Sequence, residues 1–194
     1  MRILYLYAHP LPESFHGAIR NDALACLKAA GHDVDLIDLY EDGFNPVLSA
    51  DRRRNYHNLT LNRAGLEDYI EKLHRAEAIV VQFPTWSFGP PVILKGFLDQ
   101  MMKPGIAFDL SNPGKAVPLL QNIRHVHGIV TYGRPRLHAF FVGDGPRHLV
   151  KRYLRWFAHP KAKVCYHALY HMNVATDADR KSFMARVRDA MTKL

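Results

Sequence analysis

The stretch 76-AEAIVVQFPTWSFGPPVILKGFLD-99 decides the fold of this chain. It begins with AEAIVVQF, a continuous apolar run that is typical of a parallel strand covered on both faces. Pro90 and Pro91 then lead into helically spaced apolar residues, and because proline suits the first turn of a helix we expect a helix over residues 91–102. The intervening loop, PTWSFG, carries aromatic side chains where a connecting loop is ordinarily polar.

The same alternation of strand and helix patterns runs through the rest of the chain. Apolar, β-branched runs predict further strands over residues 2–8, 33–39, 126–132 and 163–172. Helical spacing predicts helices over residues 14–31, 50–56, 62–75, 145–158 and 177–194. This order indicates a single α/β domain over residues 1–194, an open parallel sheet with helices on both faces. Such sheets bind ligands beyond the carboxyl ends of their strands, so we expect the site in the loops after residues 8, 83 and 132.

The chain is basic, but its charge does not select a class of partner. It has 26 Lys and Arg residues against 18 Asp and Glu residues, a formal charge of +8. Nucleic acid, anionic lipid and phosphorylated ligands are all compatible with that charge. The densest basic runs, Arg52 to Arg54 and the helical face of Lys151, Arg152 and Arg155, are more simply solvated surfaces. We therefore predict no nucleic-acid partner.

Two further features bear on the cellular compartment. The apolar N-terminal run is too short to span a membrane, so it is interpreted as a strand and no stable membrane insertion is expected. Cys26 and Cys165 are far apart in the sequence and form no CxxC pattern. Two such cysteines indicate reduced thiols and a cytoplasmic protein.

The first loop, AHPLPESFHGAI, lacks both the G-x-G-x-x-G pattern and the Walker P-loop. It does place Ser14, His16 and Gly17 at the start of a helix, where free N–H groups and the helix dipole favour a phosphate. His9, at the end of the strand, can add a donor. A purely structural interpretation stays open, in which Ser14 is only an N-cap and His9 an ordinary loop residue.

The loop after the 76–83 strand points to a flat ligand. Pro84 holds the backbone in a fixed path. Exposed aromatic side chains at the end of a buried strand suit an apolar ring stacked against the chain, such as an isoalloxazine, with hydroxyl groups reaching its polar edge. The residues concerned are Pro84, Thr85, Trp86, Ser87 and Phe88. The alternative, aromatic side chains that only cap the core, remains open for Phe83 and Phe88.

Three quoted stretches resemble one family. AHPLPESFHGAI, DLYEDGFNPVLS and IVVQFPTWSFGPPVILKGFLDQMMKPGIAF are similar in order and spacing to the NAD(P)H:quinone oxidoreductases of the flavodoxin-like fold, over roughly the first 110 residues. The resemblance implies a five-stranded sheet in the order 2-1-3-4-5 with a flavin at the switch point. It places His9, Ser14, Phe15 and His16 around the flavin phosphate and ribityl chain, and Pro84 to Phe88 along the isoalloxazine.

The resemblance also implies a third flavin loop, made by Thr131, Tyr132 and Gly133. Many relatives have TTGG there, followed by a Tyr and a His that assist the reaction, whereas this chain reads TYGRPRLHAFF. Arg134 therefore replaces a glycine. Tyr132 and His138 are the candidate catalytic residues, as donors that stabilise negative charge developing on the acceptor. Arg134 and Arg136 could favour a 2′-phosphate or an acidic acceptor.

The activity implied by the resemblance is NAD(P)H dehydrogenase (quinone). NAD(P)H would pass hydride to flavin N5 and leave, and a quinone or similar flat acceptor would then take the hydride from the same face. The flavin is expected to be FMN, with FAD as the alternative, and the protein to be a homodimer with its flavin pockets at the interface. A rival interpretation is a flavin-binding redox sensor or regulatory subunit, for example of a potassium-efflux system, with little turnover.

Other polar residues have weaker claims to chemistry. His125 with His127, and His167 with His171, could each contribute to a metal site, but no third ligand is evident and packed or surface histidines are favoured. Asp38 could hold a ribose hydroxyl, although without glycines in the first loop a solvated or capping aspartate is preferred. No metal site is therefore predicted.

Overall fold

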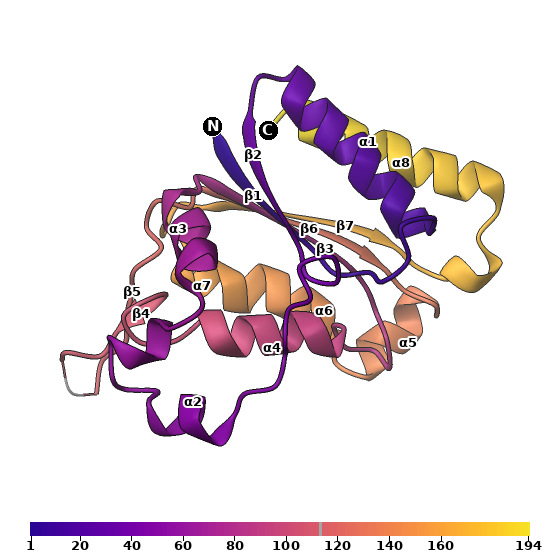
Figure 1. The fold of residues 1–194 in the computed structure, drawn as a ribbon. Coiled ribbons are helices and arrows are strands. Elements are labelled where there is room, and N and C mark those ends of the chain that lie inside the picture. The colour runs from indigo at the N-terminus through magenta and orange to yellow at the C-terminus, as the bar shows by residue number, and fades with distance from the viewer. Residues whose placement is uncertain (113) are drawn as a thin grey trace.

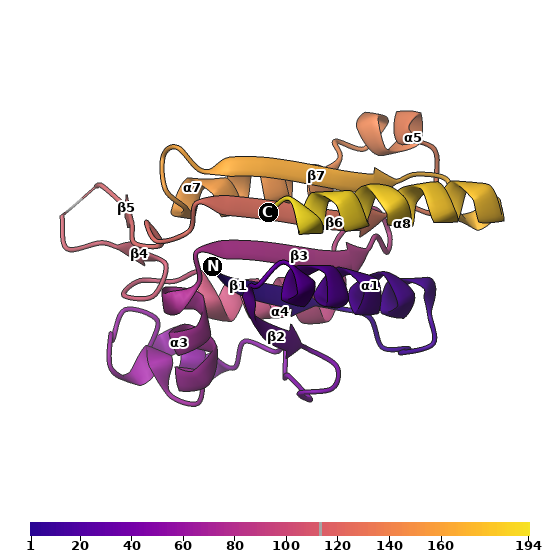
Figure 2. The same ribbon diagram turned by 90° about the horizontal axis from the view of Figure 1, so that it is seen from above.

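The computed structural model describes residues 1–112 and 114–194, and within these residues one parallel sheet forms the centre of the molecule. Its five strands lie in the order β2-β1-β3-β6-β7, which confirms the expected order. The strands are β2 (Asp33–Asp38), β1 (Arg2–Tyr7), β3 (Ala78–Pro84), β6 (His125–Thr131) and β7 (Lys163–Leu169). Figure 2 shows them side by side from above.

Helices cover both faces of the sheet (Figure 1). The helices α1 (Phe15–Ala29) and α8 (Asp177–Thr192) lie on one face. The other face carries α3 (Glu67–Arg75), α4 (Val92–Met101), α6 (Gly145–His148) and α7 (Arg155–Phe157). A π-helical turn, Leu149–Leu154, joins α6 to α7, so the predicted helix over 145–158 is continuous but locally widened.

Side-chain alternation along the strands divides the core into two layers. In β1, Ile3, Tyr5 and Tyr7 pack toward α1 and α8, whereas Leu4 and Leu6 pack toward α3 and α4. Every residue of β3 is buried, as expected for a strand covered on both faces. The continuous apolar run that begins at Ala76 is therefore explained by its central place in the sheet.

Several predicted boundaries were wrong. The helix predicted over 62–75 is a 3₁₀ turn (Leu61–Arg63) followed by α3, because Gly65 at φ +72° interrupts the helical backbone. The strand predicted to residue 172 ends at Leu169. The short helix predicted over 50–56 is confirmed as α2 (Ala50–Arg54), which ends two residues earlier.

Three elements were not predicted. They are the small hairpin of β4 (Phe108–Asp109) and β5 (Val117–Pro118) and the helix α5 (Arg136–Phe141). The α5 segment was interpreted as a loop. It is a single short helical stretch after Pro135, without a side-chain cap. A short 3₁₀ turn, Met172–Val174, also precedes α8.

Candidate functional site

Three loops meet at the carboxyl edge of the sheet. β1, β3 and β6 are neighbours, with Tyr7 beside Gln82 and Pro84 beside Thr131 in register. The Thr85 N–H donates to the Thr131 carbonyl over 2.8 Å, so the second loop is fastened to the third where both strands end. β1 lies between β2 and β3, which is where the strand order reverses. The loops after residues 8, 83 and 132 therefore come together at the switch point, where open α/β sheets bind ligands.

The aromatic loop after β3 is a tight, strained turn, Trp86–Gly89. The Trp86 N–H donates to the Gly89 carbonyl over 3.0 Å, and the Gly89 N–H donates back over 2.9 Å. Its central residues, Ser87 at φ +50° and Phe88 at φ +59°, occupy the left-handed region that non-glycine residues avoid. Each such residue costs on the order of 1–3 kcal/mol, and strain of this kind clusters at ligand sites. The turn leaves Trp86 44% exposed.

The N-terminus of α1 faces the same edge. Ser14 caps the helix by accepting from the Gly17 N–H over 3.1 Å, which confirms the predicted cap. A side chain at Gly17 would lie 1.9 Å from the Pro12 carbonyl oxygen, so only glycine lets the loop fold over the helix. Within the described residues, the N–H groups of Phe15 and His16 have no hydrogen-bond partner. Two free donors and the helix dipole can therefore receive an anion.

His9 stands between the helix and the aromatic turn. Its Nδ1 accepts from the Leu11 N–H over 3.1 Å, so the neutral ring carries its proton on Nε2. Burial lowers the pKa of His9 below 6.5 despite the opposing effects of the Leu11 hydrogen bond and of Glu13. The ring centroid lies 6.2 Å from that of Trp86. His9 thus offers one neutral N–H donor beside an exposed indole.

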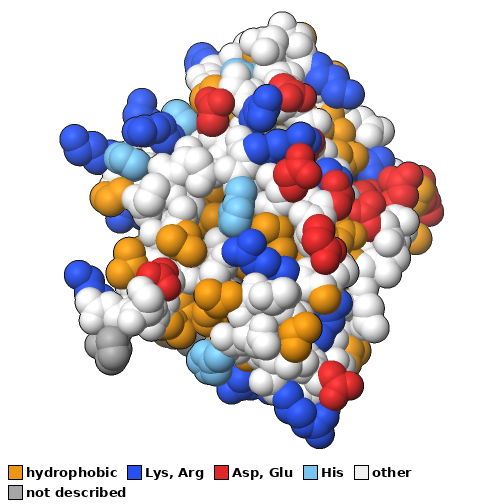
Figure 3. Space-filling view, turned by 60° about the vertical axis from the view of Figure 1, so that its left-hand side comes forward, with side chains coloured by type: hydrophobic (Ala, Val, Ile, Leu, Met, Phe, Trp, Pro, Cys, Tyr) orange, Lys and Arg blue, Asp and Glu red, His pale blue; other side chains and the backbone are white. Residues whose placement is uncertain are grey.

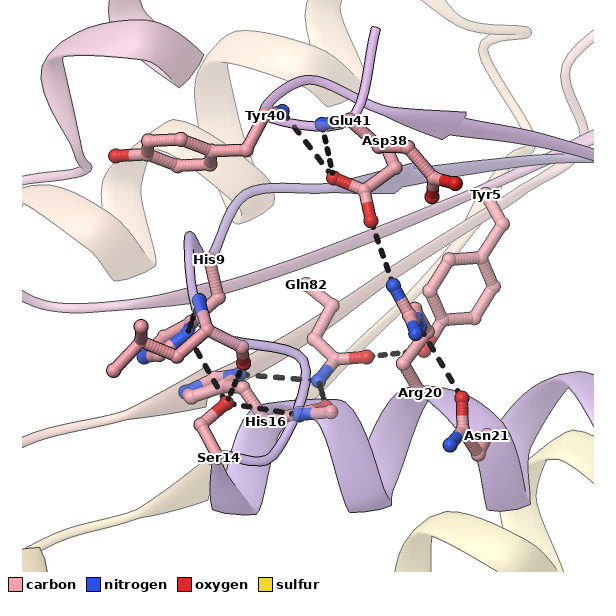
Figure 4. A network of polar contacts seen from close by, with 12 residues as sticks. Tyr5, His9, Ser14, His16, Arg20, Asn21, Asp38, Tyr40, Glu41 and Gln82 are labelled. Carbon is pink, nitrogen blue, oxygen red and sulfur yellow. Dashed lines mark hydrogen bonds and ion pairs between the residues drawn. The ribbon is translucent and has the colours of Figure 1, made fainter.

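His16 lies below the surface of the site and is 4% exposed (Figure 4). Its Nδ1 is 3.0 Å from the Gln82 amide nitrogen and its Nε2 is 2.8 Å from the Thr131 hydroxyl. Gln82 also donates to the His16 carbonyl over 2.8 Å and accepts from the Tyr5 hydroxyl. Burial, with a smaller effect from His9, lowers the pKa of His16 to about 3. The His16 ring therefore links α1, β3 and β6, and of His16 only the backbone N–H is available to a phosphate.

Asp38 is a capping residue rather than a free ribose ligand. One carboxylate oxygen accepts from the N–H groups of Tyr40 and Glu41 over 3.2 and 3.3 Å, and the other pairs with Arg20 at 2.6 Å. The pair borders a cavity of about 350 Å³ beside His9. Of the two structural interpretations, capping is confirmed and solvation is wrong, because Asp38 is 6% exposed.

The third loop does not present its tyrosine to solvent. Tyr132 is 1% exposed, and its hydroxyl donates to Asp144 Oδ1 over 2.6 Å and contacts the Tyr166 hydroxyl. Its ring stacks on Tyr170, with the centroids 4.5 Å apart. Burial and the neighbouring Tyr166 and Asp144 raise the pKa of Tyr132 far above 10. Thr131 and Gly133 remain at the edge of the site, but the Tyr132 hydroxyl is engaged inside the fold.

His138, the other candidate catalytic residue, lies on α5 and is exposed. The two candidate catalytic residues therefore lie in different surroundings: the Tyr132 hydroxyl is buried in a tyrosine cluster, which does not fit a donor that contacts an acceptor, and His138 is on an outer helix. The fold does combine His127 with His167, whose rings stack at 5.6 Å. In the described part of the chain, no group of three or more His, Cys, Asp or Glu side chains is arranged for a metal ion.

Two residues important to this arrangement were missed in the sequence. Gln82 is an amide in an otherwise apolar strand, and it is fully buried because its donors and acceptor are all satisfied. Its presence in the run IVVQF was the available signal. Asp144 follows Gly143 in a loop, and no sequence pattern connected it with Tyr132.

The surface charge is distributed over the molecule rather than gathered in one stripe on the face seen in Figure 3. Acidic side chains collect along one edge of that face, and basic side chains are scattered around the rest.

Among the helices of the described residues, none combines the length and apolar character needed to cross a membrane. Both cysteines are free thiols and partly buried.

Comparison with known proteins extends the geometric result. The family model described as the flavodoxin-like fold matches residues 1–194. An uncharacterized NAD(P)H oxidoreductase of Haemophilus influenzae is 34% identical over 69% of this chain and 65% of its own length. Human ribosyldihydronicotinamide dehydrogenase [quinone] is 32% identical over 56% of this chain and 54% of its own length. The chain thus spans less than two thirds of either curated relative.

A solved structure is similar over the whole chain. The crystal structure of Smu.1420 from Streptococcus mutans UA159 superposes with a TM-score of 0.88 and 27% sequence identity, covering 100% of both chains. The residues beyond the first 110, where the sequence resemblance is weak, therefore share the arrangement of that structure.

Proposed function

Because the chain belongs to the flavodoxin-like fold family, we propose that it is a flavin-dependent NAD(P)H:quinone oxidoreductase. The single observation that carries this proposal is the strained Trp86–Gly89 turn, which presents an exposed indole beside an anion-binding helix N-terminus. A flat ring with a phosphate tail is the ligand that such a pair fits. The name of the Haemophilus influenzae relative, an NAD(P)H oxidoreductase, supports the donor, and that of the human relative, a ribosyldihydronicotinamide dehydrogenase [quinone], supports the acceptor.

The first loop would hold the phosphate and the second the ring. The free N–H groups of Phe15 and His16 donate to phosphate oxygens at the positive end of α1, and Ser14 keeps the first turn in place. Trp86 and the turn backbone line the isoalloxazine. His9, whose ring lies 6.2 Å from that of Trp86, would offer its Nε2–H to the flavin. Pro84, Thr85 and Gly133 complete the edge.

A bound flavin supplies the hydride chemistry, accepting from NAD(P)H and passing to a quinone. The protein's own contribution is positioning and charge. The His16–Gln82–Thr131 network fixes the floor of the site through hydrogen bonds that are all satisfied internally. Tyr132 acts as a positioning residue that ties the third loop to Asp144. His138 remains the exposed side chain through which this loop could approach an acceptor.

FMN is the proposed form of the flavin. The cavity beside His9, on the side toward β2, is bordered by the carboxylates of Asp38 and Glu41, and Arg20 is already paired with Asp38. A second phosphate and adenosine placed there would meet this negative charge at close range, which is unfavourable in a partly buried site. Chromatography of flavin released from the purified protein should give FMN, and FAD as the released species would overturn this choice.

The homodimer is proposed through the surface beside α4, which borders the aromatic turn at Gly145, so that the flavin pockets adjoin the interface. A groove of about 700 Å³ lies between α4 and the π-helical turn, with mostly apolar walls that include Leu98, Leu149, Tyr153 and Trp156. Lys95 and Asp99 pair along its rim at 2.5 Å. A second copy of the chain is the proposed occupant, because a rim with both charge signs can match its own copy across a two-fold axis.

The two unpaired cysteines support a cytoplasmic location.

The visible spectrum of the purified protein tests the proposed activity. We expect a flavin spectrum, either as purified or after adding FMN, that bleaches under anaerobic NADPH or NADH and recovers when a quinone is added. Continuous NAD(P)H oxidation with quinone should then be measurable. Failure to bind FMN or FAD under any condition would contradict the proposed function.

A further inference from the structure

A third cavity, of about 340 Å³, lies between α5 and the segment formed by α6 and the π-helical turn. Its lining is basic and carries one aromatic ring: Arg136, Phe140, Gly143, Asp144, Arg147, His148 and Arg152. The proposed flavin contacts use none of these side chains. The sequence indicated that Arg134 and Arg136 could favour a 2′-phosphate or an acidic acceptor, and of these two residues Arg136 lines the cavity. Arg152 was interpreted as part of a solvated basic face, and Arg147 was not singled out.

The three guanidinium groups of this cavity lack counterions. Among the described residues, no carboxylate lies within ion-pair distance of Arg136, Arg147 or Arg152. Asp144 is the only acidic residue of the lining, and its Oδ1 already accepts from the buried Tyr132 hydroxyl. The cavity therefore concentrates positive charge in a concave surface, which attracts and holds anions.

The cavity adjoins the flavin site. Gly145, the residue after Asp144, lies beside the aromatic turn: a β-carbon built on Gly145 would be 3.8 Å from the Phe88 carbonyl oxygen. Arg147 is held over the Tyr166 ring at 5.6 Å, and Arg152 lies in the π-helical turn, a distortion often found at functional sites. A co-substrate that stacks at the turn can thus extend into the cavity.

We infer that this cavity binds a phosphomonoester carried by the nicotinamide donor, the 2′-phosphate of NADPH, and that the enzyme therefore prefers NADPH to NADH. The inference rests on the proposed function. Arginine forks match phosphate oxygens in a bidentate manner, and more than one guanidinium is needed to neutralise a dianion. Phe140, which is 72% exposed, offers a face on which the adenine of the same nucleotide can stack.

Arg136→Gln tests the inference without disturbing the core or the groove proposed for the second copy, because Arg136 is exposed and does not line that groove. Arg152→Gln is measured beside it, since Arg152 is exposed but lines both the basic cavity and the groove. Each variant should lower kcat/KM for NADPH by about ten- to hundredfold, the range for losing a charged hydrogen bond, and leave kcat/KM for NADH nearly unchanged. Arg134→Gln is the matched control, since Arg134 is exposed and close in sequence but does not line the cavity. Equal losses with NADPH and NADH would overturn the inference.

Calorimetric titration with 2′,5′-ADP and 5′-AMP gives a readout that does not depend on turnover. The protein should bind 2′,5′-ADP more tightly than 5′-AMP, and Arg136→Gln should remove most of that difference. Equal affinity of the unaltered protein for the two nucleotides would overturn the inference even if quinone reduction is observed. Conversely, selective 2′,5′-ADP binding without any NADPH oxidation would show that the proposed function has failed and the phosphate site has not.

An anionic acceptor is the other source of a charged group. Suppose that Arg136→Gln and Arg152→Gln raise the KM for a sulfonated quinone while the ratio of kcat/KM for NADPH to that for NADH stays constant. The cavity then binds the acceptor, and its assignment to the donor is wrong. An uncharged quinone assayed in parallel separates this effect from a general loss of acceptor binding. If the cavity binds the 2′-phosphate of NADPH, each variant should use every acceptor as efficiently as the unaltered protein does at saturating NADH.

Discussion

The Thr131 hydroxyl and the His16 ring show how one pair of side chains can support a site that neither occupies. Gln82 donates to His16 Nδ1, so the neutral ring carries its proton on Nε2. In the described structure the acceptor for that N–H is the Thr131 hydroxyl. A buried imidazole that is neutral at pH 7 and fully hydrogen-bonded makes a rigid floor. We expect the free energy of unfolding to fall more when a hydrogen-bond partner of His16 is removed than when side-chain volume alone is lost.

Thr131→Val tests this view at the residue scale. Valine keeps the shape of threonine but leaves the His16 N–H unsatisfied, so the free energy of unfolding should fall by about 1–3 kcal/mol. Thr85→Val is the matched control and should change it by less, since the Thr85 hydroxyl has no hydrogen bond within the described residues and is partly exposed. Urea unfolding of both variants checks the prediction, and equal stabilities would contradict it.

Sequence reasoning at this scale succeeded where a local rule applied and failed where the fold decides. Ser14 was identified because a serine before a helical pattern caps it locally. Tyr132 was assigned to the flavin because it follows a strand, yet strand alternation continues past Thr131. Since Val130 packs in the core layer that contains α4 and the π-helical turn, Tyr132 packs there as well. Applying the alternation to residue 132 would have predicted its burial.

At the scale of elements, the Trp86–Gly89 turn combines rigidity with strain. Two neighbouring positive φ values suit an Asn-Gly pair, but the chain has Ser87 and Phe88 there. The reciprocal hydrogen bonds and the link from Thr85 to β6 hold this backbone in place. Sequence indicated an unusual loop from its aromatic residues and prolines. The positive φ values could not be predicted, because the residue types at those positions disfavour them.

Ser87→Gly should relieve part of that strain. Glycine adopts positive φ without steric cost, so the free energy of unfolding should rise by up to about 1 kcal/mol. Flavin affinity should fall at the same time, because a turn with more freedom is less preorganised. Thermal unfolding and FMN titration measure the two effects. A destabilised Ser87→Gly protein would show that the serine side chain, and not the backbone, matters at this position.

At the scale of the whole molecule, parallel-sheet topology is what brings residues 9, 86 and 131 together. The strand order was inferable because strand and helix patterns alternate and the first 110 residues resemble a known family. The α5 helix and the widened turn at Leu149–Leu154 were not inferable, since both depend on packing against the finished sheet. The widened turn contributes Leu149, Arg152 and Tyr153 to the groove along α4, and α5 contributes Arg136 and Phe140 to the basic cavity.

Acid should destabilise the folded protein well before its carboxylates protonate. Burial lowers the pKa of His16 to about 3 and, with His167 and His125, that of His127 to about 4, while both are near 6.5 in the unfolded chain. Only the unfolded state binds these protons as pH falls from about 6.5 toward 4, so stability is lost by up to about 1.4 kcal/mol per pH unit for each histidine. Urea unfolding at pH 7 and pH 5 should show this loss, with a shallower dependence in His127→Gln. Stability that does not change between these pH values would contradict the burial argument.

Self-association should depend on the groove beside α4. Val92 is 75% exposed at its border, so Val92→Glu should leave the monomer folded and shift sedimentation toward monomer by placing a carboxylate in an apolar contact. Val174→Glu is the control, with Val174 64% exposed near the start of α8. A dimer that persists in Val92→Glu, or that is lost equally in Val174→Glu, would rule out this face.

The most direct test of the flavin site uses the chain's two tryptophans. Trp156→Phe leaves Trp86 as the only indole, and Trp86→Phe leaves Trp156, which is similarly exposed but lies in the α4 groove. Titration of FMN into each variant, followed by tryptophan fluorescence, should give strong, saturable quenching in Trp156→Phe and much weaker quenching in Trp86→Phe. Quenching that is absent from Trp156→Phe, while absorption shows that FMN is bound, would place the flavin away from the Trp86 turn and contradict the account.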